Sequence, residues 1–171
     1  MSFLKLAKAR FSVRSYQPRP IEDKKMERII EAGRVAPTAC NLQPQRIFVV
    51  KSEENRRKLA LICRFTFDAP TVLVVCYDKD ICWKNKRMNG HPSGETDAAI
   101  VATHMMLAAA EEGIGSCWVG VFNSDEVKKI LDLPENLVVT ALMPMGYPAP
   151  GATPAPFHSE IRPLEETVRE L

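Results

Sequence analysis

The chain has 171 residues, of which 46% are hydrophobic and 26% charged, and its formal net charge is +2. A chain of this size can form one globular domain that buries roughly 70% of its unfolded surface without a disulfide scaffold. The near balance of charge gives no general basis for binding nucleic acid or a membrane. We therefore expect one domain over residues 1–171 and neither of these partners.

Apolar periodicity and turn residues predict an alternation of helices and strands. In chain order we expect a helix at 2–9, a helix at 20–36, a strand at 47–50, a helix at 52–62, a strand at 71–77, a helix at 97–112, a helix at 125–131 and a strand at 137–143. The strands are short apolar runs rich in β-branched residues, which indicates burial. This order favours an α+β or three-layer α/β architecture around one sheet.

The helix at 97–112 differs from the others in its pattern. From Ala98 to Ala110 it carries no charge and is apolar on nearly all sides. Such a pattern is typical of a helix that is buried on more than one side. Because one small domain covers such a helix poorly, we expect part of it to lie in a subunit interface.

Two segments are not assigned to regular structure. Residues 78–96 form a polar stretch that is long for a loop, and loops of this length are usually functional or mobile. Within it, Lys84, Lys86 and Arg87 are either solvated or attract an anionic cosubstrate. Six of the 13 prolines lie from Pro144 onward, which predicts an extended segment unable to join the interior of a sheet. The end of this segment is either an arm that packs on a partner subunit or a disordered tail.

Cysteine and histidine usage bears on compartment and metal binding. Five cysteines occur without a C-x-x-C pair, and three histidines lie far apart. An odd number of irregularly spaced cysteines favours reduced thiols, and the histidine spacing does not predict a zinc site. No signal peptide is evident, and the longest uncharged helical stretch is shorter than the roughly 20 residues that span a bilayer. We expect a cytoplasmic protein that holds no metal.

The segment "ARFSVRSY" is the first candidate binding element. In an extended chain, alternate side chains share one face, so Arg10, Ser12 and Arg14 would point the same way. Two forked guanidinium donors and a hydroxyl suit a phosphate or an anionic ring. A solvated basic turn is the alternative interpretation.

The loop between Ala36 and Gln45 is the second candidate, because it contains no charged residue. Thr38, Asn41 and Gln43 supply donors and acceptors that can orient a polar heterocycle in an apolar pocket. Helix capping and turn chemistry would use the same residue types.

The stretch "GIGSCWVG" is the third candidate. It does not match the dinucleotide fingerprint, because Trp118 stands where a glycine is needed and a helix precedes the glycines. Gly113 is placed to end that helix, whereas Gly115 and Gly120 allow close approach of the backbone to a flat group. Cys117 is interpreted as a buried structural thiol.

Five segments in register resemble the nitroreductase family of FMN-dependent NAD(P)H oxidoreductases, in its short form. They are "RFSVRSY", "APTACNLQPQRIFVV", "TDAAIVATHMMLAAAEEGIGSCWVGVF", "LPENLVVTALMPMGYPA" and "RPLEE", and together they cover nearly the whole chain. The resemblance implies an α+β fold, a three-layer α/β/α sandwich around a mixed, mainly antiparallel sheet. It also implies an intertwined homodimer with two FMN sites at the interface, and an arm at 148–171 that packs on the partner.

The resemblance also implies which residues bind FMN. They are Arg10, Phe11, Ser12, Arg14, Thr38, Ala39, Asn41, Gln43, Trp118, Val119, Gly120, Val121 and Arg162. Arg10 and Arg162 would hold the phosphate, and the backbone of residues 119–121 would approach the flavin N5. Arg14 would lie at the pyrimidine end and stabilise the reduced ring. No catalytic acid or base is required of a side chain.

The activity implied is a ping-pong reaction in which NADH or NADPH reduces FMN, which then reduces a nitroaromatic, a quinone or another small acceptor. Alternatives on the same fold are reductive dehalogenation, flavin breakdown, or a non-catalytic flavin sensor or store. The sequence leaves open the acceptor and the choice between NADH and NADPH. Two positions depart from the common pattern: Gln45 replaces an aromatic residue, and Glu160 replaces a base that would add to the phosphate site.

Overall fold

The computed structural model describes residues 2–171. Its helices and strands are α1 (Phe3–Ala9), α2 (Asp23–Arg34), β1 (Gln45–Val50), α3 (Glu53–Ile62), β2 (Thr71–Asp78), β3 (Lys84–Asn85), β4 (His91–Pro92), α4 (Gly94–Glu111), β5 (Gly115–Ser116), α5 (Ser124–Ile130), β6 (Leu137–Gly146) and α6 (Leu164–Thr167). The eight elements expected from the sequence are all present, with ends that shift by a few residues.

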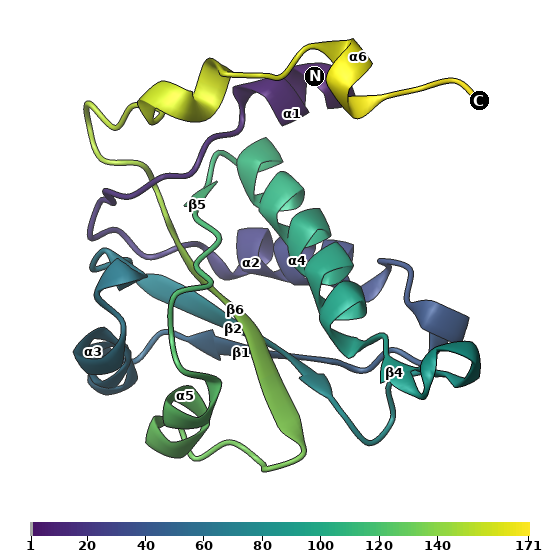
Figure 1. Ribbon diagram of the computed structural model, residues 1–171. Coiled ribbons are helices and arrows are strands. Elements are labelled where there is room, and N and C mark those ends of the chain that lie inside the picture. Colours follow the sequence, from purple (N-terminus) through teal and green to yellow (C-terminus); the bar gives the residue numbers. More distant parts are fainter. Residues whose placement is uncertain (1) are drawn as a thin grey trace.

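The centre of the fold is a four-stranded sheet in the order β1-β2-β6-β5, drawn in Figure 1. Each neighbouring pair in it is antiparallel. A parallel bridge between Ser12 and Ser116 extends the sheet at the β5 edge, so the pairing is mixed but mainly antiparallel, as expected.

Helices cover both faces of the sheet. On one face, α2 and α4 pack through Ile29 and Met105 against Leu73 and Met143, all of which are buried. On the other face, α3 and α5 complete a second cluster that includes Leu59. Because strand β2 is buried on both faces, it reads in the sequence as a continuous apolar run rather than an alternation. The architecture is the predicted α+β fold with three layers.

Two termini of helices follow from simple capping chemistry. Ser52 accepts a hydrogen bond from the Asn55 N–H at the start of α3. After α4, Gly113 has a φ of +73°, the left-handed conformation that a glycine adopts at low cost. The predicted end of this long helix is therefore confirmed, although its start lies three residues earlier than expected, at Gly94.

The expectation that Pro144 could not join the sheet was wrong. Pro144 lies within β6, opposite Val72 of β2. Its carbonyl accepts hydrogen bonds from the Cys117 N–H (3.2 Å) and the Tyr16 hydroxyl (3.0 Å). The N–H and C=O of a strand residue point to the same side of the strand. The Pro144 carbonyl faces Cys117, so the position of its missing N–H also faces Cys117 and not β2. The pairing of β6 with β2 therefore loses no hydrogen bond.

The polar stretch at 78–96 is built as regular structure and not as one long loop. It contains the hairpin β3–β4, a short 3₁₀ turn (Lys86–Met88) between the two strands, and the first turn of α4. Its turn uses Asn89 and Gly90 in the left-handed region, and an Asn-Gly pair in this conformation is typical of a hairpin turn.

The C-terminal segment begins against the chain's own N-terminal segment. Pro148 bridges to Tyr16, and the Ala149 N–H donates to the Ser15 carbonyl (3.0 Å). Further on, the His158 ring lies 3.2 Å from the Lys8 carbonyl, so the segment passes over α1 (Figure 1). Its last apolar side chains are exposed in the single chain. In the described part of the chain, no helix is both long and apolar enough to cross a membrane.

Candidate flavin site

The Arg-rich segment after α1 is extended and fixed to β5. The Val13 N–H donates to the Ser116 carbonyl (3.0 Å), and Val13 is buried. A methyl group on Gly115 would lie 2.6 Å from Val13 Cγ2, so the close approach of the two segments requires glycine at this position. The Tyr16 hydroxyl adds a hydrogen bond to the Val13 carbonyl (2.7 Å), which holds the end of the segment.

The thiol of Cys117 lies beside this segment, and its Sγ donates a hydrogen bond to the Trp118 carbonyl (3.7 Å). Burial raises the pKa of Cys117, whereas the charge of Arg14, a hydrogen bond from Ser12 and the charge of Arg10 each act to lower it. The thiol itself stays protonated at neutral pH, which agrees with a structural role.

Arg14 shares an open pocket of about 180 Å³ with the segment after β5. The pocket is lined by Arg14, Phe65, Phe67, Cys117, Trp118, Val119, Gly120 and Val121. Val119 exchanges two backbone hydrogen bonds with Leu142 of β6, at 2.9 and 3.0 Å, so this wall is rigid. The predicted backbone approach at residues 119–121 is thus available beside Arg14.

Phe65 and Phe67 were not among the residues expected at the site. They follow α3 in a short 3₁₀ turn (Arg64–Thr66), and their rings meet edge to face at 6.1 Å. The signal in the sequence was "RFTFDAP", a pair of aromatic residues just before a buried strand. No local pattern places these rings beside Trp118. Their position follows from the packing of α3 against the sheet.

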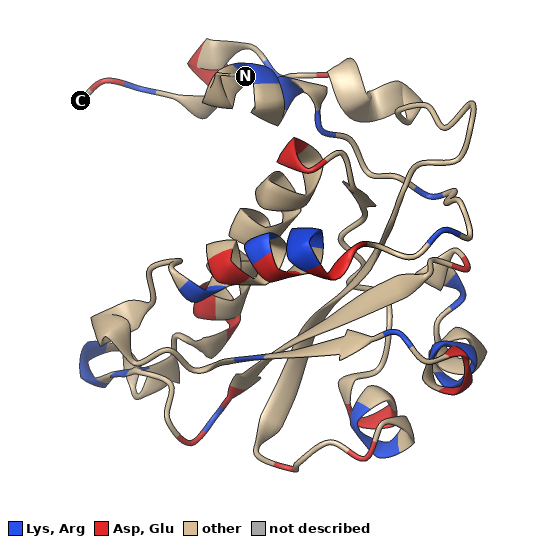
Figure 2. Ribbon diagram, turned by 180° about the vertical axis from the view of Figure 1, so that it is seen from behind, with Lys and Arg blue, Asp and Glu red and all other residues tan. Residues whose placement is uncertain are grey.

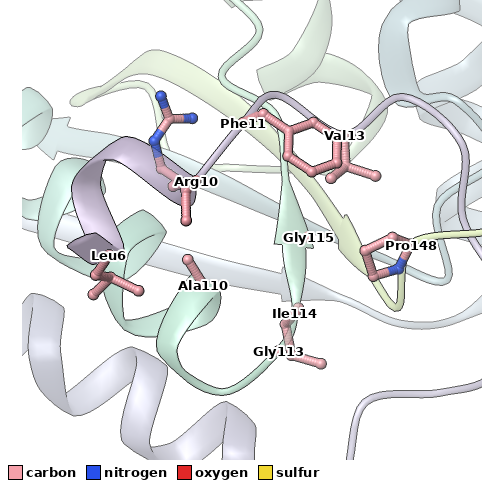
Figure 3. A pocket seen from close by; sticks show the side chains of 10 residues that line it. Leu6, Arg10, Phe11, Val13, Ala110, Gly113, Ile114, Gly115 and Pro148 are labelled. Carbon is pink, nitrogen blue, oxygen red and sulfur yellow. The ribbon is translucent and has the colours of Figure 1, made fainter. Parts of the chain in front are cut away.

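Arg10 and Phe11 line a second pocket, which is mostly apolar and also about 180 Å³. Its floor comes from α1, the end of α4 and β5, and includes Leu6, Ala110 and Ile114. Figure 3 shows the Arg10 guanidinium pointing away from Leu6 and Ala110. The charged end of Arg10 is therefore free to meet a group outside this apolar floor.

The uncharged loop between Ala36 and Gln45, called the neutral loop below, contains both turn hydrogen bonds and backbone strain. The Thr38 hydroxyl accepts from the Gln43 N–H (3.1 Å), and the Gln43 amide nitrogen lies 3.3 Å from Asn41 Oδ1. Cys40, Asn41 and Gln43 all have φ near +50°, a region that side chains other than glycine rarely adopt. Such strain is concentrated at binding and catalytic sites in proteins.

The two predicted groups of ligands lie at opposite ends of α4. The Ala39 N–H donates to Asp97 in the first turn of this helix (2.8 Å), whereas Arg10 lies beside Ala110 in its last turn. Asp97 and Ala110 are roughly 20 Å apart at the rise of an α-helix. One chain therefore does not bring the neutral loop next to the Arg-rich segment (Figure 1).

Three further positions named from the sequence are Arg162, Gln45 and Glu160. Arg162 is exposed in the C-terminal segment and pairs with Glu166 at 3.1 Å. Gln45 is half-buried in β1, and its Oε1 atom is buried without a hydrogen-bond partner among the described residues. Glu160 is exposed.

Comparison with known proteins identifies the family. The model of the nitroreductase family matches residues 7–64 and 60–147. The chain belongs to the nitroreductase family. This confirms the resemblance on which the expected fold rested.

Individual members of the nitroreductase family are similar over nearly the full chain. A nitroreductase family protein from Clostridium difficile 630 is 38% identical, with a TM-score of 0.91 over 99% of this chain and 98% of its own. An FMN-dependent nitroreductase from Clostridium difficile R20291 is 25% identical, with a TM-score of 0.81 over 98% of each chain. A relative from Archaeoglobus fulgidus, whose name describes an NADH dehydrogenase or NAD(P)H nitroreductase, is 33% identical over 85% of this chain and 84% of its own.

Proposed function

We propose that the protein is an FMN-dependent oxidoreductase. It takes reducing equivalents from NADH or NADPH and passes them to a nitroaromatic, a quinone or another small acceptor in a ping-pong sequence. Membership of the nitroreductase family supports this, as do the names of the relatives, one an FMN-dependent nitroreductase and another an NAD(P)H nitroreductase. The observation that carries it is the pocket that joins Arg14 to residues 117–121.

The residues of this pocket suit a flavin nucleotide. Phe65, Phe67 and Trp118 supply apolar and aromatic walls, and the ideal Cβ position of Gly120 has free space around it, with the nearest atom at 4.0 Å. Within residues 2–171, neither Arg10 nor Arg14 is engaged in a salt bridge. A flat ring and an anionic phosphate would use these two features together.

Each group of residues then has a defined task. FMN, when bound, supplies the hydride chemistry, and the protein supplies binding and electrostatics. Arg10, with Arg162 from the C-terminal segment, holds the phosphate. Arg14 places positive charge at the pyrimidine edge, where negative charge develops on reduction. The backbone at 119–121, which hydrogen bonds hold to β6 at Val119, would support the ring on one side.

The separation of the two ligand groups along α4 favours a site assembled from two copies of the chain. In this arrangement the Arg-rich segment of one protomer faces the neutral loop of its partner. The outward side of α4 supports a homodimer, because Leu107 there is apolar and only partly covered by the single chain. The exposed apolar residues of the C-terminal arm would pack on the partner subunit. All five cysteines are free thiols, which suits the reducing cytoplasm.

The visible spectrum of the purified protein, followed by anaerobic addition of NADH or NADPH, tests the proposed function. We expect a flavin spectrum. At least one of the two nucleotides should bleach it, and a quinone should then restore it. A protein that takes up no added FMN would refute the proposal, and a bound flavin that neither nucleotide bleaches would indicate a store or sensor. Arg10→Ala should lower the FMN content of the purified protein at unchanged dimer mass, with Lys8→Ala as the control on the preceding helix.

A further inference from the structure

The hairpin over residues 82–93 is a rigid element that the flavin site does not account for. Its strands pair Lys84 with Pro92 and Asn85 with His91. The Ser93 N–H donates to the Trp83 carbonyl (2.8 Å) and the Gly90 N–H to the Asn85 carbonyl (2.9 Å). Cys82 is buried and anchors the base. The backbone of the hairpin is therefore held in a defined conformation.

The hairpin carries positive charge only. Lys84, Lys86 and Arg87 are exposed, and no Asp or Glu occurs between residues 81 and 94. Figure 2 shows this basic segment as blue ribbon at the turn. By contrast, Arg57 and Lys58 of α3 each pair with a glutamate four residues earlier. In the described residues, the three hairpin cations take part in no salt bridge, so their charge is available to an anion.

Two apolar side chains accompany these cations. Trp83 is 36% exposed and Met88 is 60% exposed, and both belong to the same hairpin as the cations. An aromatic ring beside several cations can stack on a planar base while the cations meet phosphate groups. This combination fits a nucleotide better than it fits an isolated inorganic anion.

One buried carboxylate joins the hairpin to the neutral loop. Asp97 is 2% exposed; its Oδ1 accepts from the Ala39 N–H (2.8 Å) and its Oδ2 accepts from the Ser93 hydroxyl (2.7 Å). The base of the hairpin and the start of the neutral loop are thus tied to the same residue in the first turn of α4. A ligand held by the hairpin is therefore held at a fixed position relative to the loop.

We propose that Lys84, Lys86 and Arg87 bind the phosphate groups of the nicotinamide dinucleotide during reduction of the flavin. The inference rests on the proposed function and adds to it the element that recognises the reducing substrate. The cations supply attraction for the phosphates, and Trp83 supplies a surface for the adenine. Asp97 is a positioning residue that holds the hairpin next to the neutral loop.

The test is the reductive half-reaction of the flavin-loaded protein, with Lys86→Glu/Arg87→Glu compared with Lys24→Glu/Lys129→Glu. The control pair makes the same charge reversals at exposed positions of α2 and α5. We expect the apparent Kd for NADPH to rise at least tenfold in the hairpin variant while the limiting rate of flavin bleaching changes less than twofold. The Kd of the wild-type protein should rise with ionic strength, and that of the variant should rise much less.

Direct binding gives a readout independent of turnover. Titration with NADP⁺, followed by the fluorescence of the two tryptophans, should show the same loss of affinity in the hairpin variant and none in the control. A larger effect for NADPH than for NADH assigns the cations to the 2′-phosphate, and an equal effect assigns them to the pyrophosphate.

Three outcomes would overturn the proposal. Unchanged nucleotide constants in the hairpin variant would show that the cations are merely solvated. A change confined to the oxidation step with 4-nitrobenzoate would assign the hairpin to an anionic acceptor instead. If neither NADH nor NADPH bleaches the wild-type flavin, the proposed function itself is refuted. That result is distinguishable because it does not depend on the variants.

Discussion

Gln45 holds one of two buried side-chain polar atoms that have no hydrogen-bond partner in the described chain, the other being Thr140 Oγ1. It stands at the start of β1, and its Oε1 atom is the unpaired acceptor. A buried acceptor without a donor destabilises a fold by roughly 1–3 kcal/mol. Such a position either carries this cost or receives a donor from a second copy or a ligand.

The substitution Gln45→Met separates these two cases. If the acceptor is unpaired in solution, removal of the amide at similar volume should stabilise the protein by about 1 kcal/mol, seen as a higher midpoint in urea unfolding. Gln43→Met, at an exposed position, should give no such gain. A loss of stability in the Gln45 variant would show instead that its amide is hydrogen-bonded in the assembled protein.

The extended segment over residues 10–16 is the element that positions the candidate site. It is held to β5 and β6 by backbone hydrogen bonds and by Tyr16, whose pKa is strongly raised by its burial. Gly115 permits this contact because a side chain there would meet Val13. The direction of Arg10 and Arg14 thus depends on a glycine that need not touch the ligand.

Gly115→Ala tests this dependence. The added methyl group should force Val13 away and lower the free energy of unfolding by about 1–3 kcal/mol, because overpacking a tight contact has this cost. FMN retention should fall with it, measured by the ratio of flavin to protein absorbance. Gly120→Ala makes the same chemical change where there is space and should leave the unfolding midpoint nearly unchanged. Equal stability of the two variants would disprove the role given to Gly115.

At the scale of the whole molecule, α4 connects the two halves of the candidate site, and its outward side is only partly covered by the single chain. Its inward side, with Val101 and Met105, is fully buried in the single chain. The outward side, including Leu107, is not. Antiparallel association through this side would bring the start of α4 in one protomer near the end of α4 in its partner.

Leu107→Glu should therefore produce a monomer that has lost FMN. A charge buried at the centre of an interface opposes association strongly, whereas the same change on an exposed surface does not. Leu61→Glu on α3, where the side chain is 83% exposed, is the matched control. Sedimentation should give about twice the mass of one chain for the wild type and the control. A dimeric Leu107 variant with full flavin content would contradict the assembly.

Much of the fold could be predicted because its elements are encoded locally. Apolar runs gave β1, β2 and β6, and capping residues such as Ser52 and Gly113 gave helix ends. The hairpin at β3–β4 was missed because its strands are two residues long and carry polar residues, which leaves periodicity nothing to detect. Pro144 was misjudged because the direction of its missing N–H depends on which strand lies on each side.

The sequence by itself determined the family, the layered α+β class and the chemical types of the candidate ligands, because motif order and apolar patterning are properties of the linear chain. Tertiary structure alone decided where those ligands lie. It placed Phe65 and Phe67 beside Trp118, fixed Val13 against Gly115, and tied both Ser93 and Ala39 to Asp97. These contacts join residues far apart in the chain, and their energies depend on close packing and on pairing of buried polar groups, which no local pattern specifies.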